Sequence, residues 1–450
     1  MWGYEMSIFG DARLEDRFDW LMARIVTTGS IVLRRLGQDR AGELAAHRFL
    51  DNDRIDVEEI VATFSERTGA CCAGRRIIAV QDTTEINFSG RDRGRTGLGA
   101  GGNGDALGFF IHPVIAIDRD DEAVVGLVDV QIWTREDGPL APHRSRVFAK
   151  KESYRWLIGA ERSQQRLAAA ESVVMVGDRE ADIYALFARC PKAIDLVVRS
   201  AYDRSLSDDK RLLESLKDLP DFGTMEVKVS PRPGQKARLA RLRLRAGRIT
   251  LRRPQNRLDE GDPKALCLTV VESYEVDPPK GVKPLNWRLL TSLAVDDEAD
   301  AREIIHIYRQ RWRIEEVFRA LKSTGLRLEE TQVEAAHRLF KLAALGIAAA
   351  VRIIQLVDAR DASARPAKDI IDEALIPAVA LIGKGLEGKT KRQQNTHQQG
   401  SLAWLSWITA RLGGWNCYYK PPGPKTMAIG WNQLTAQVTG VIIAQNAIDV

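Results

Sequence analysis

Two apolar runs that each end in an aspartate constrain the fold more than any other feature of this 450-residue sequence. They are RRIIAVQD, residues 75–82, and SVVMVGD, residues 172–178. A short, uninterrupted apolar run is typical of a strand that is buried on both faces. Between them lie the strand patterns FFIHPVIAID and AVVGLVDVQIW and the helix pattern ESYRWLIGAERSQQRLAAA, and the helix pattern READIYALFARC follows the second run. This order predicts an α/β fold.

The order strand, strand, strand, helix, strand, helix is that of a ribonuclease-H-like core, and different patterns flank it. The N-terminal part has helical apolar spacing, a middle part consists of short β-patterned pieces, and the chain is helical again after Asp300. Because the chain is too long for one compact core, we expect several domains. They are a helical domain at 1–70, a ribonuclease-H-like domain at 71–365 with a β-rich insertion at about 196–292, and a helical C-terminal domain at 366–450.

A glycine-rich, charged segment, SGRDRGRTGLGAGGNGDALG, follows the first apolar run. Glycines in such number raise the question of a phosphate-binding loop. The segment lacks the Gly-Lys-Ser/Thr ending of a P-loop, so a mobile loop is the favoured interpretation.

Positive charge is concentrated between Lys228 and Arg257, where eleven Lys or Arg residues stand without an Asp or Glu, in a chain of net charge +5. Within RLRLRAGRITLRR, arginines alternate with leucines and a hairpin turn is predicted at Ala246-Gly247. Such a run is usually a solvated face, but uncompensated charges repel one another unless a polyanion is near, which favours contact with a DNA backbone. The later run GKTKRQQ fits DNA contact and a flexible linker equally well. The cationic face of the hairpin consists of Arg241, Arg243 and Arg245.

Cysteine usage and hydropathy indicate a reducing compartment and no membrane span. The five cysteines contain no CxxC pair, so neither a disulfide framework nor a zinc site is expected. The N-terminus lacks the basic-then-apolar pattern of a signal peptide. The longest apolar run, LFKLAALGIAAAVRIIQLV, contains Lys341 and Arg352, which favours a packed core helix. The expected localisation is a bacterial cytoplasm.

Three carboxylates stand out by their positions. Asp82 and Asp178 end the two apolar runs, and strand ends of an α/β sheet are where ligands collect. The alternative for each is that it caps the turn or helix that follows. The third, Glu315, lies in a pattern typical of a helix. Carboxylates without His or Cys are the ligands that Mg²⁺ and Mn²⁺ prefer, and two such ions can catalyse phosphoryl transfer.

Glu315 belongs to IYRQRWRIEEVFRALKSTG, residues 307–325. On a continuous helix, offsets of 0, 3, 7 and 14 residues place four polar side chains within about 60° of one another. The alternative is an exposed face with ordinary ion pairs, which is our interpretation of Glu316, with Arg313 and Arg319 as partners. The four polar side chains are Tyr308, Arg311, Glu315 and Lys322.

The same residues read Y-x2-R-x3-E-x6-K, which resembles the signature of bacterial insertion-sequence transposases of the DDE class. VQDTTEINFS and VGDREADIY are similar to the segments that carry the first and second catalytic aspartates of that family. The resemblance implies a metal-binding triad that holds two Mg²⁺ or Mn²⁺ ions and a set of side chains that contact DNA. The implied triad is Asp82, Asp178 and Glu315; the implied DNA contacts are Tyr308, Arg311, Lys322, Arg199 and Trp287, on which a flipped base would stack, with Lys151, Glu152 and Arg155 approaching DNA.

The resemblance also implies a reaction sequence. A homodimer would pair two inverted-repeat ends of double-stranded DNA, cleave them, through a hairpin intermediate, and join the 3′ ends to target DNA. A transposase-derived protein that binds DNA without cleaving it is the alternative. A phosphatase with Asp82 as the phosphorylated residue is disfavoured, because Thr84 stands where that chemistry needs a second Asp.

Overall fold

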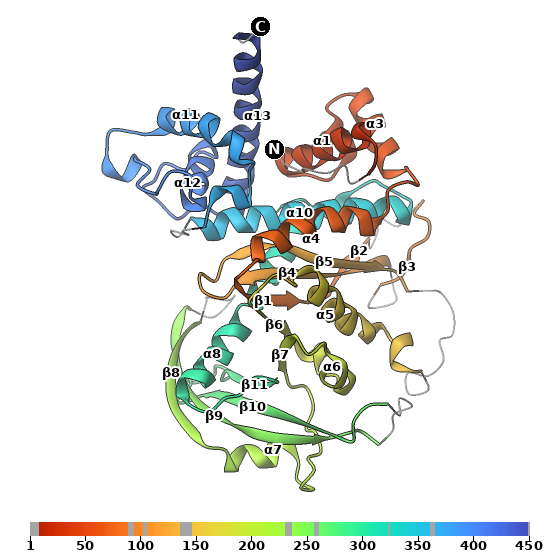
Figure 1. The fold of residues 1–450 in the computed structure, drawn as a ribbon, viewed down its shortest axis with the longest axis vertical. Helices are drawn as coiled ribbons and strands as arrows, with labels where there is room; N and C mark the ends of the chain where they lie inside the picture. Colours follow the sequence, from red (N-terminus) through yellow and green to blue (C-terminus); the bar gives the residue numbers. More distant parts are fainter. Residues whose placement is uncertain are drawn as a thin grey trace. The chain divides into compact units, whose positions relative to one another are not determined.

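The computed structural model describes residues 9–88, 94–101, 106–135, 146–229, 236–255, 261–322, 325–360 and 365–448. The chain forms two compact units (Figure 1). Unit 1 comprises Met1–Ala73, Thr83–Asp137 and Arg313–Val450, and unit 2 comprises Gly74–Asp82 and Gly138–Trp312. Mixed sheet and helices in these units make the fold α/β, as predicted.

Unit 2 is built on a mixed sheet with the strand order β1-β6-β7-β11-β10-β9-β8. The first three strands are parallel to one another, and each later neighbour pairs antiparallel. The strands are β1 (Arg76–Gln81), β6 (Ser172–Gly177), β7 (Ile194–Arg199), β8 (Asp221–Val229), β9 (Arg238–Arg252), β10 (Ala265–Glu275) and β11 (Asn286–Thr291). β1 and β6 are the two predicted apolar strands. β7 was predicted as part of the β-rich insertion, but it pairs parallel with β6 and extends that sheet.

The helices of unit 2 are short and lie on this sheet: α5 (Arg155–Arg166), α6 (Tyr184–Arg189), α7 (Leu212–Ser215) and α8 (Glu298–Arg309). α5 packs on β1, and α8 packs on β7, β8, β9 and β10. The predicted helix READIYALFARC forms only in part, because a 3-10 turn at Arg179–Ala181 precedes α6. Close packing explains Gly177 before that turn, since a Cβ there would lie 3.1 Å from the buried Trp156 ring and closer still to Ala181.

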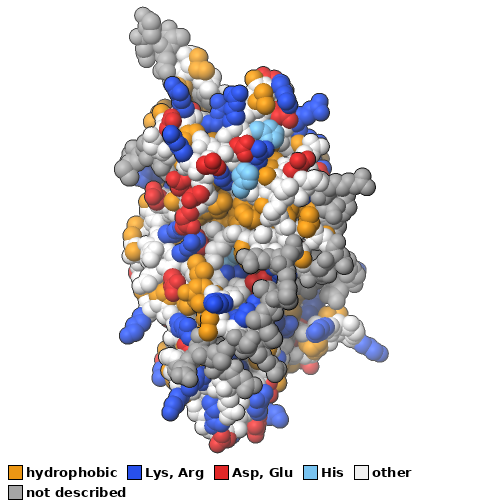
Figure 2. All heavy atoms as spheres, turned by 90° about the vertical axis from the view of Figure 1, so that its right-hand side faces the viewer, with side chains coloured by type: hydrophobic (Ala, Val, Ile, Leu, Met, Phe, Trp, Pro, Cys, Tyr) orange, Lys and Arg blue, Asp and Glu red, His pale blue; other side chains and the backbone are white. Residues whose placement is uncertain are grey.

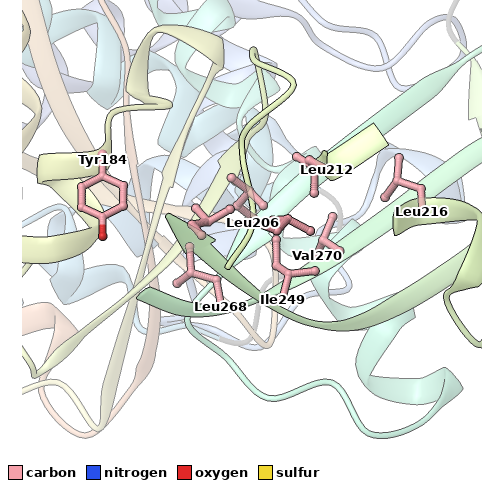
Figure 3. Close-up of a cluster of buried hydrophobic side chains, with 9 residues drawn as sticks. Tyr184, Leu206, Leu212, Leu216, Ile249, Leu268 and Val270 are labelled. Atoms are coloured by element: carbon pink, nitrogen blue, oxygen red, sulfur yellow. The ribbon is translucent and has the colours of Figure 1, made fainter. Parts of the chain in front are cut away.

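An apolar cluster in unit 2 lies between α6, α7 and the antiparallel strands (Figure 3). Its buried members are Tyr184, Leu206, Leu212, Leu216, Ile249, Leu251, Leu268, Val270 and Leu290. The antiparallel strands of the β-rich insertion are therefore packed against α6 and α7 by apolar side chains.

The predicted hairpin turn at Ala246-Gly247 is wrong, because β9 continues through it as one strand. Gly247 pairs with Val270 of β10, and Ala246 is buried. A two-residue hairpin turn needs positive φ angles, and neither residue has one. The glycine serves close packing instead, since a Cβ at Gly247 would lie 2.7 Å from Cδ2 of Leu219.

Unit 1 combines helices with an antiparallel set of strands. Four helices precede the strands, as the N-terminal pattern predicted: α1 (Ala12–Thr28), α2 (Leu33–Gly37), α3 (Arg40–Leu50) and α4 (Val57–Cys72). β4 (Leu107–Asp118) pairs with β2 (Thr84–Asn87), β3 (Gly99–Ala100) and β5 (Val124–Trp133). The later helices are α9 (Trp312–Leu321, whose first residue belongs to unit 2), α10 (Ala336–Ala359), α11 (Ile376–Leu386), α12 (Leu402–Leu412) and α13 (Pro424–Ile448).

α10 is the central helix of unit 1. It packs on β5, and α1, α4, α12 and α13 pack on it (Figure 1). Among the helices that the structure describes, it is the one long and apolar enough to cross a membrane, and 89% of its apolar window is buried within the protein. That burial is what the sequence predicted for a core helix.

The glycine-rich segment lies partly outside the described residues. Its described parts are residues 94–101 and 106–108, and the first of them makes tertiary contacts that the prediction of a mobile loop did not include. Thr96 donates its backbone N–H to the Glu334 carbonyl at 3.1 Å, and Arg95 donates to the Thr331 carbonyl at 2.7 Å. The Arg95 guanidinium also lies over the Phe88 ring, 3.7 Å from its centroid. Glycine content could not predict the two hydrogen bonds, because their partners lie more than 200 residues away in the sequence.

Candidate active site

Asp82 and Asp178 lie at the same level of the unit 2 sheet. β1 and β6 are parallel neighbours with Val80 opposite Val176, and each aspartate follows two residues later. Since adjacent strands are about 4.8 Å apart, this register brings the two aspartates together at the carboxyl edge of the sheet. Both predicted strand ends are confirmed, and the parallel pairing makes them neighbours.

Each aspartate has a described partner. Asp178 Oδ1 accepts a hydrogen bond from the Glu180 backbone N–H at 2.7 Å, so it does cap the 3-10 turn, as the alternative interpretation proposed. Asp82 Oδ2 accepts from Nη1 of Arg311 at 2.8 Å, and both side chains are largely buried, with 15% and 17% exposed. The guanidinium compensates a carboxylate that burial would otherwise penalise.

Arg155, at the start of α5, adds a second cation near the aspartates. Burial lowers the pKa of Arg155, and Glu180, Glu152, Asp178 and Asp82 all act in the opposite direction. Its Nη2 pairs with Glu180 Oε2 at 2.6 Å. Because both aspartates act on the pKa of Arg155, its guanidinium belongs to the same cluster.

Tyr308, on the later helix α8, belongs to the same cluster. Burial raises the pKa of Tyr308, opposed by Arg311 and by Arg199, with which it shares a hydrogen bond, while Asp178 adds to the rise. The Tyr308 ring lies 6.0 Å from the Trp287 ring, centroid to centroid. Unit 2 thus gathers six of the predicted site residues: Asp82, Asp178, Arg199, Trp287, Tyr308 and Arg311.

The strands explain why Arg199 and Trp287 meet Tyr308. Arg199 ends β7 opposite Leu289 of β11, and its Nη2 donates to the Asn286 carbonyl at 3.2 Å. Trp287 is the second residue of β11. Residues almost ninety positions apart are therefore side by side on neighbouring strands, and α8 packs on β7.

The prediction of one continuous helix through Tyr308, Arg311, Glu315 and Lys322 is wrong. α8 ends at Arg309 and α9 begins at Trp312. The backbone N–H groups of Gln310 and Arg311 bond three residues back, each at 3.1 Å, so the α-helical repeat stops there. No glycine or proline stands at this break; Gln310 is buried and Arg311 turns to Asp82, so tertiary contacts outweigh helix propensity.

Glu315 and Lys322 belong to unit 1. Glu315 is half-buried on α9, four residues after Arg311 along the chain. Lys322 follows α9, donates a hydrogen bond to the Glu85 carbonyl and lies 3.7 Å from Glu329. The predicted surface role of Glu316 is confirmed by its ion pairs with Arg313 at 3.2 Å and Arg319 at 4.0 Å.

The candidate ligands are carboxylates, which suit a divalent cation, but they are not assembled as one cluster. Within the described ranges, no group of three or more His, Cys, Asp and Glu side chains is placed to hold a metal ion. Asp82 and Asp178 offer carboxylate oxygens at one sheet edge, and such oxygens are the ligands of Mg²⁺. One oxygen of Asp82 is engaged by Arg311, so a metal there would take the place of the guanidinium.

The basic strand β9 is more compensated than its sequence suggested. Arg241 pairs with Asp277 at 3.0 Å, Arg243 pairs with Asp221, and Arg245 lies over the Tyr274 ring at 5.2 Å. The acids come from β8 and from the turn after β10, and lie 22 and 36 residues along the chain from the arginines with which they pair. The premise of uncompensated charge is therefore wrong, and on the face shown in Figure 2 basic and acidic side chains are interspersed.

One carboxylate that the sequence reasoning missed is Asp182, four residues after Asp178. Its side chain is fully buried and pairs with Arg204, and its Oδ2 accepts from the Ala201 backbone N–H at 2.7 Å. The signal that could have found it is a third acid in the turn GDREAD, since a buried Asp needs partners.

Comparison with protein families is consistent with this geometry. Residues 159–352 match the family model of the transposase DDE domain. The matched span includes Asp178, Trp287, Tyr308 and Glu315, and begins after Asp82. The match supports a transposase of the DDE class.

Proposed function

We propose that the protein is a cut-and-paste DNA transposase with a ribonuclease-H-like core and the Y-R-E-K signature. The observation that carries the proposal is the parallel register of β1 and β6, which puts Asp82 and Asp178 beside each other with Arg155, Arg199, Tyr308 and Arg311 around them. Two neighbouring carboxylates with three arginines and a tyrosine around them match the chemistry of a phosphodiester.

Asp82, Asp178 and Glu315 would hold two Mg²⁺ or Mn²⁺ ions, which activate water or a 3′-hydroxyl for attack on phosphorus. The protein's own groups do the rest. Arg311, released from Asp82, and Arg199 bind phosphate oxygens as charge-assisted donors. Tyr308 is neutral at physiological pH, as an ordinary tyrosine is, and burial raises its pKa further, so its hydroxyl can donate to a backbone oxygen. Trp287 offers its ring to a base, and Lys322 contacts the cleaved strand.

The remaining parts of the proposal concern assembly. The helical segment 1–70 recognises the inverted repeats, the segment 366–450 dimerises, and cleavage passes through a DNA hairpin before the ends join target DNA. Arg241 and Arg243 contact DNA by exchanging their acidic partners for phosphates, and Arg245 contacts it beside them. The protein acts in a bacterial cytoplasm, at the nucleoid when bound.

The test uses the full-length protein and duplex DNA that carries the inverted repeats flanking its gene. Wild type should cleave this DNA when Mg²⁺ or Mn²⁺ is added, and Asp82→Asn, Asp178→Asn and Glu315→Gln should each reduce cleavage to background while binding persists. Glu316→Gln is the matched control, since it changes the adjacent carboxylate on the same helix and should cleave normally.

The alternative, a transposase-derived protein that binds DNA without cleavage, makes the opposite prediction. Wild type would bind the repeats and leave them intact at every metal concentration. Full cleavage by Asp178→Asn would instead overturn the assignment of the metal-binding carboxylates.

A further inference from the structure

Unit 2 contains a cavity of about 830 Å³ that the proposed chemistry does not use. It lies beside the turn after β6, because Glu180, Asp182 and Tyr184 line it. Other walls come from the segment before α5, the loop at residues 202–205 and the end of β9. Since Asp178 begins the same turn, the cavity adjoins the strand end that carries a candidate catalytic carboxylate.

The loop at residues 202–205 is pinned by one buried carboxylate. Asp182 accepts hydrogen bonds from the backbone N–H of Ala201 at 2.7 Å and of Tyr202 at 3.2 Å, and from Nε of Arg204 at 2.8 Å. Its side chain is fully buried, so these bonds are sheltered from water. The backbone that carries Tyr202 is therefore held firmly in one conformation.

Tyr202 is nevertheless 63% exposed, while it lines the cavity. The backbone that carries this exposed ring donates hydrogen bonds to Asp182. The Arg204 guanidinium lies 5.6 Å from the ring centroid and is nearly buried. An exposed ring on a hydrogen-bonded backbone, with a cation beside it, is a surface on which a planar base can stack.

The charges of the cavity suit a phosphate. Five cationic side chains line it against three acidic ones: Lys151, Arg204, Arg211, Arg252 and Arg253 against Glu180, Asp182 and Asp203. Arg252 pairs with Asp209, whose side chain is 84% exposed, so water weakens that pair and a phosphate can replace it. The net excess of positive charge lies on the β9 side of the cavity.

We propose that this cavity binds an unpaired nucleotide of the DNA substrate, with its base stacked on Tyr202 and its phosphate facing Arg252 and Arg253. The inference rests on the proposed function, because it names the part of the DNA that this protein holds next to the aspartates. It assigns a stacking position in addition to Trp287. An unpaired nucleotide is required because a base within a duplex has no free face.

The experiment compares two DNA probes on the full-length protein. One is a blunt repeat-end duplex, and the other carries a short single-stranded extension with 2-aminopurine, whose fluorescence falls on stacking. Tyr202→Ala should weaken binding of the extended probe by about tenfold and abolish the quench, because stacking contributes at about this level per base. Binding of the blunt duplex should not change.

Two variants separate stacking from damage to the fold. Tyr202→Trp keeps an aromatic face and should restore both affinity and quench, and Tyr419→Ala removes an even more exposed tyrosine of unit 1 as the matched control. Arg253→Gln should reduce the slope of log affinity against log salt by about 0.7 for the extended probe, as for one lost phosphate contact on a single strand.

Equal binding of the extended probe by wild type and Tyr202→Ala would overturn the inference, as would equal weakening for both probes. These outcomes differ from failure of the proposed function, which would appear as no metal-dependent cleavage by the wild type.

Discussion

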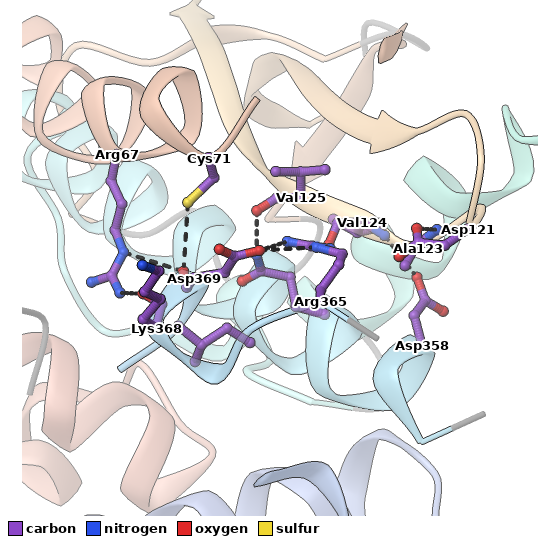
Figure 4. Close-up of polar contacts among 12 residues, drawn as sticks. Arg67, Cys71, Asp121, Ala123, Val124, Val125, Asp358, Arg365, Lys368 and Asp369 are labelled. Atoms are coloured by element: carbon purple, nitrogen blue, oxygen red, sulfur yellow. Dashed lines mark hydrogen bonds and ion pairs between the residues drawn. The ribbon is translucent and has the colours of Figure 1, made fainter. Parts of the chain in front are cut away.

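Asp358, near the end of α10, provides the sharpest test of the electrostatics in unit 1. Its side chain is 3% exposed and accepts from the Val124 backbone N–H at 3.2 Å (Figure 4). Arg313, at the start of α9, lies 2.9 Å away and also pairs with Glu316. Two more charged groups act on the pKa of Asp358: Glu316 raises it and Arg360 lowers it. The perturbation is Asp358→Asn, which keeps the shape and removes the charge.

Burial raises the pKa of Asp358 from 3.8 to about 6, even though Arg313 favours the charged form. A folded pKa above the unfolded one means that the folded state binds the proton more tightly. Stability from this group is therefore fully present below about pH 4, is lost as the pH rises through 6, and is then constant. One pKa unit corresponds to about 1.4 kcal/mol, so the loss is roughly 3 kcal/mol.

The expected result is that Asp358→Asn equals wild type in unfolding free energy near pH 4 and exceeds it by roughly 1–3 kcal/mol at pH 7.5. The pKa of about 6 already includes the attraction of Arg313, whose side chain is 29% exposed and keeps Glu316 in the variant. Urea unfolding at pH 4.5, 5.5, 6.5 and 7.5 measures the difference. Glu373→Gln, which removes a well-exposed carboxylate of the same unit, is the control.

Parallel pH profiles of wild type and Asp358→Asn would refute the reasoning, because they would mean that Asp358 ionises equally easily in both states. So would a variant less stable than wild type by more than about 1 kcal/mol at pH 7.5, since the ion pair would then outweigh desolvation.

Three further changes test the packing of unit 2. Gly247→Val should lower the unfolding free energy by about 1–3 kcal/mol in urea titrations, because its Cβ would overlap Leu219. Asp182→Asn should cost about 3–5 kcal/mol and increase hydrogen exchange in the 201–204 loop, because it leaves a nearly buried guanidinium without its carboxylate. Tyr308→Phe should cost about 1–2 kcal/mol in thermal or urea unfolding, because Arg199 loses a hydrogen-bond partner while the ring remains.

The first two of these changes have a matched control. Gly261→Ala adds a Cβ where nothing lies within 4 Å and should be nearly neutral. Asp209→Asn removes the partner of Arg252 at a well-exposed position and should cost less than about 1 kcal/mol. If Asp209→Asn lowered the unfolding free energy as much as Asp182→Asn does, burial would not be what makes the Asp182 pair important. For Tyr308→Phe, a loss beyond about 3 kcal/mol would indicate that the ring itself has shifted.

Local pattern was sufficient for the strands that carry the aspartates, for the helical N-terminal part and for the buried helix α10. Apolar runs and helical spacing are properties of neighbouring residues, and burial of such runs is the dominant favourable term in folding. The ion pairs of Glu316 were predictable for the same reason, because partners three residues apart meet on any helix.

Local pattern could not predict which segments distant in sequence pair with one another. Ala246-Gly247 within a basic run predicts a turn. The strand β9 nevertheless continues through these residues, because β10 and Leu219 lie against Gly247. The basic run appears uncompensated, yet Asp221 and Asp277 neutralise two of its arginines.

The sequence by itself determined which residues form the strand ends and which residue types are present for metal and phosphate chemistry. Only the tertiary structure decided that Asp82 and Asp178 share one level of the sheet, and that the helix breaks where Arg311 turns to Asp82. The physical reason is that periodicity records local burial, whereas strand register and the desolvation of a charge depend on what the rest of the chain brings alongside.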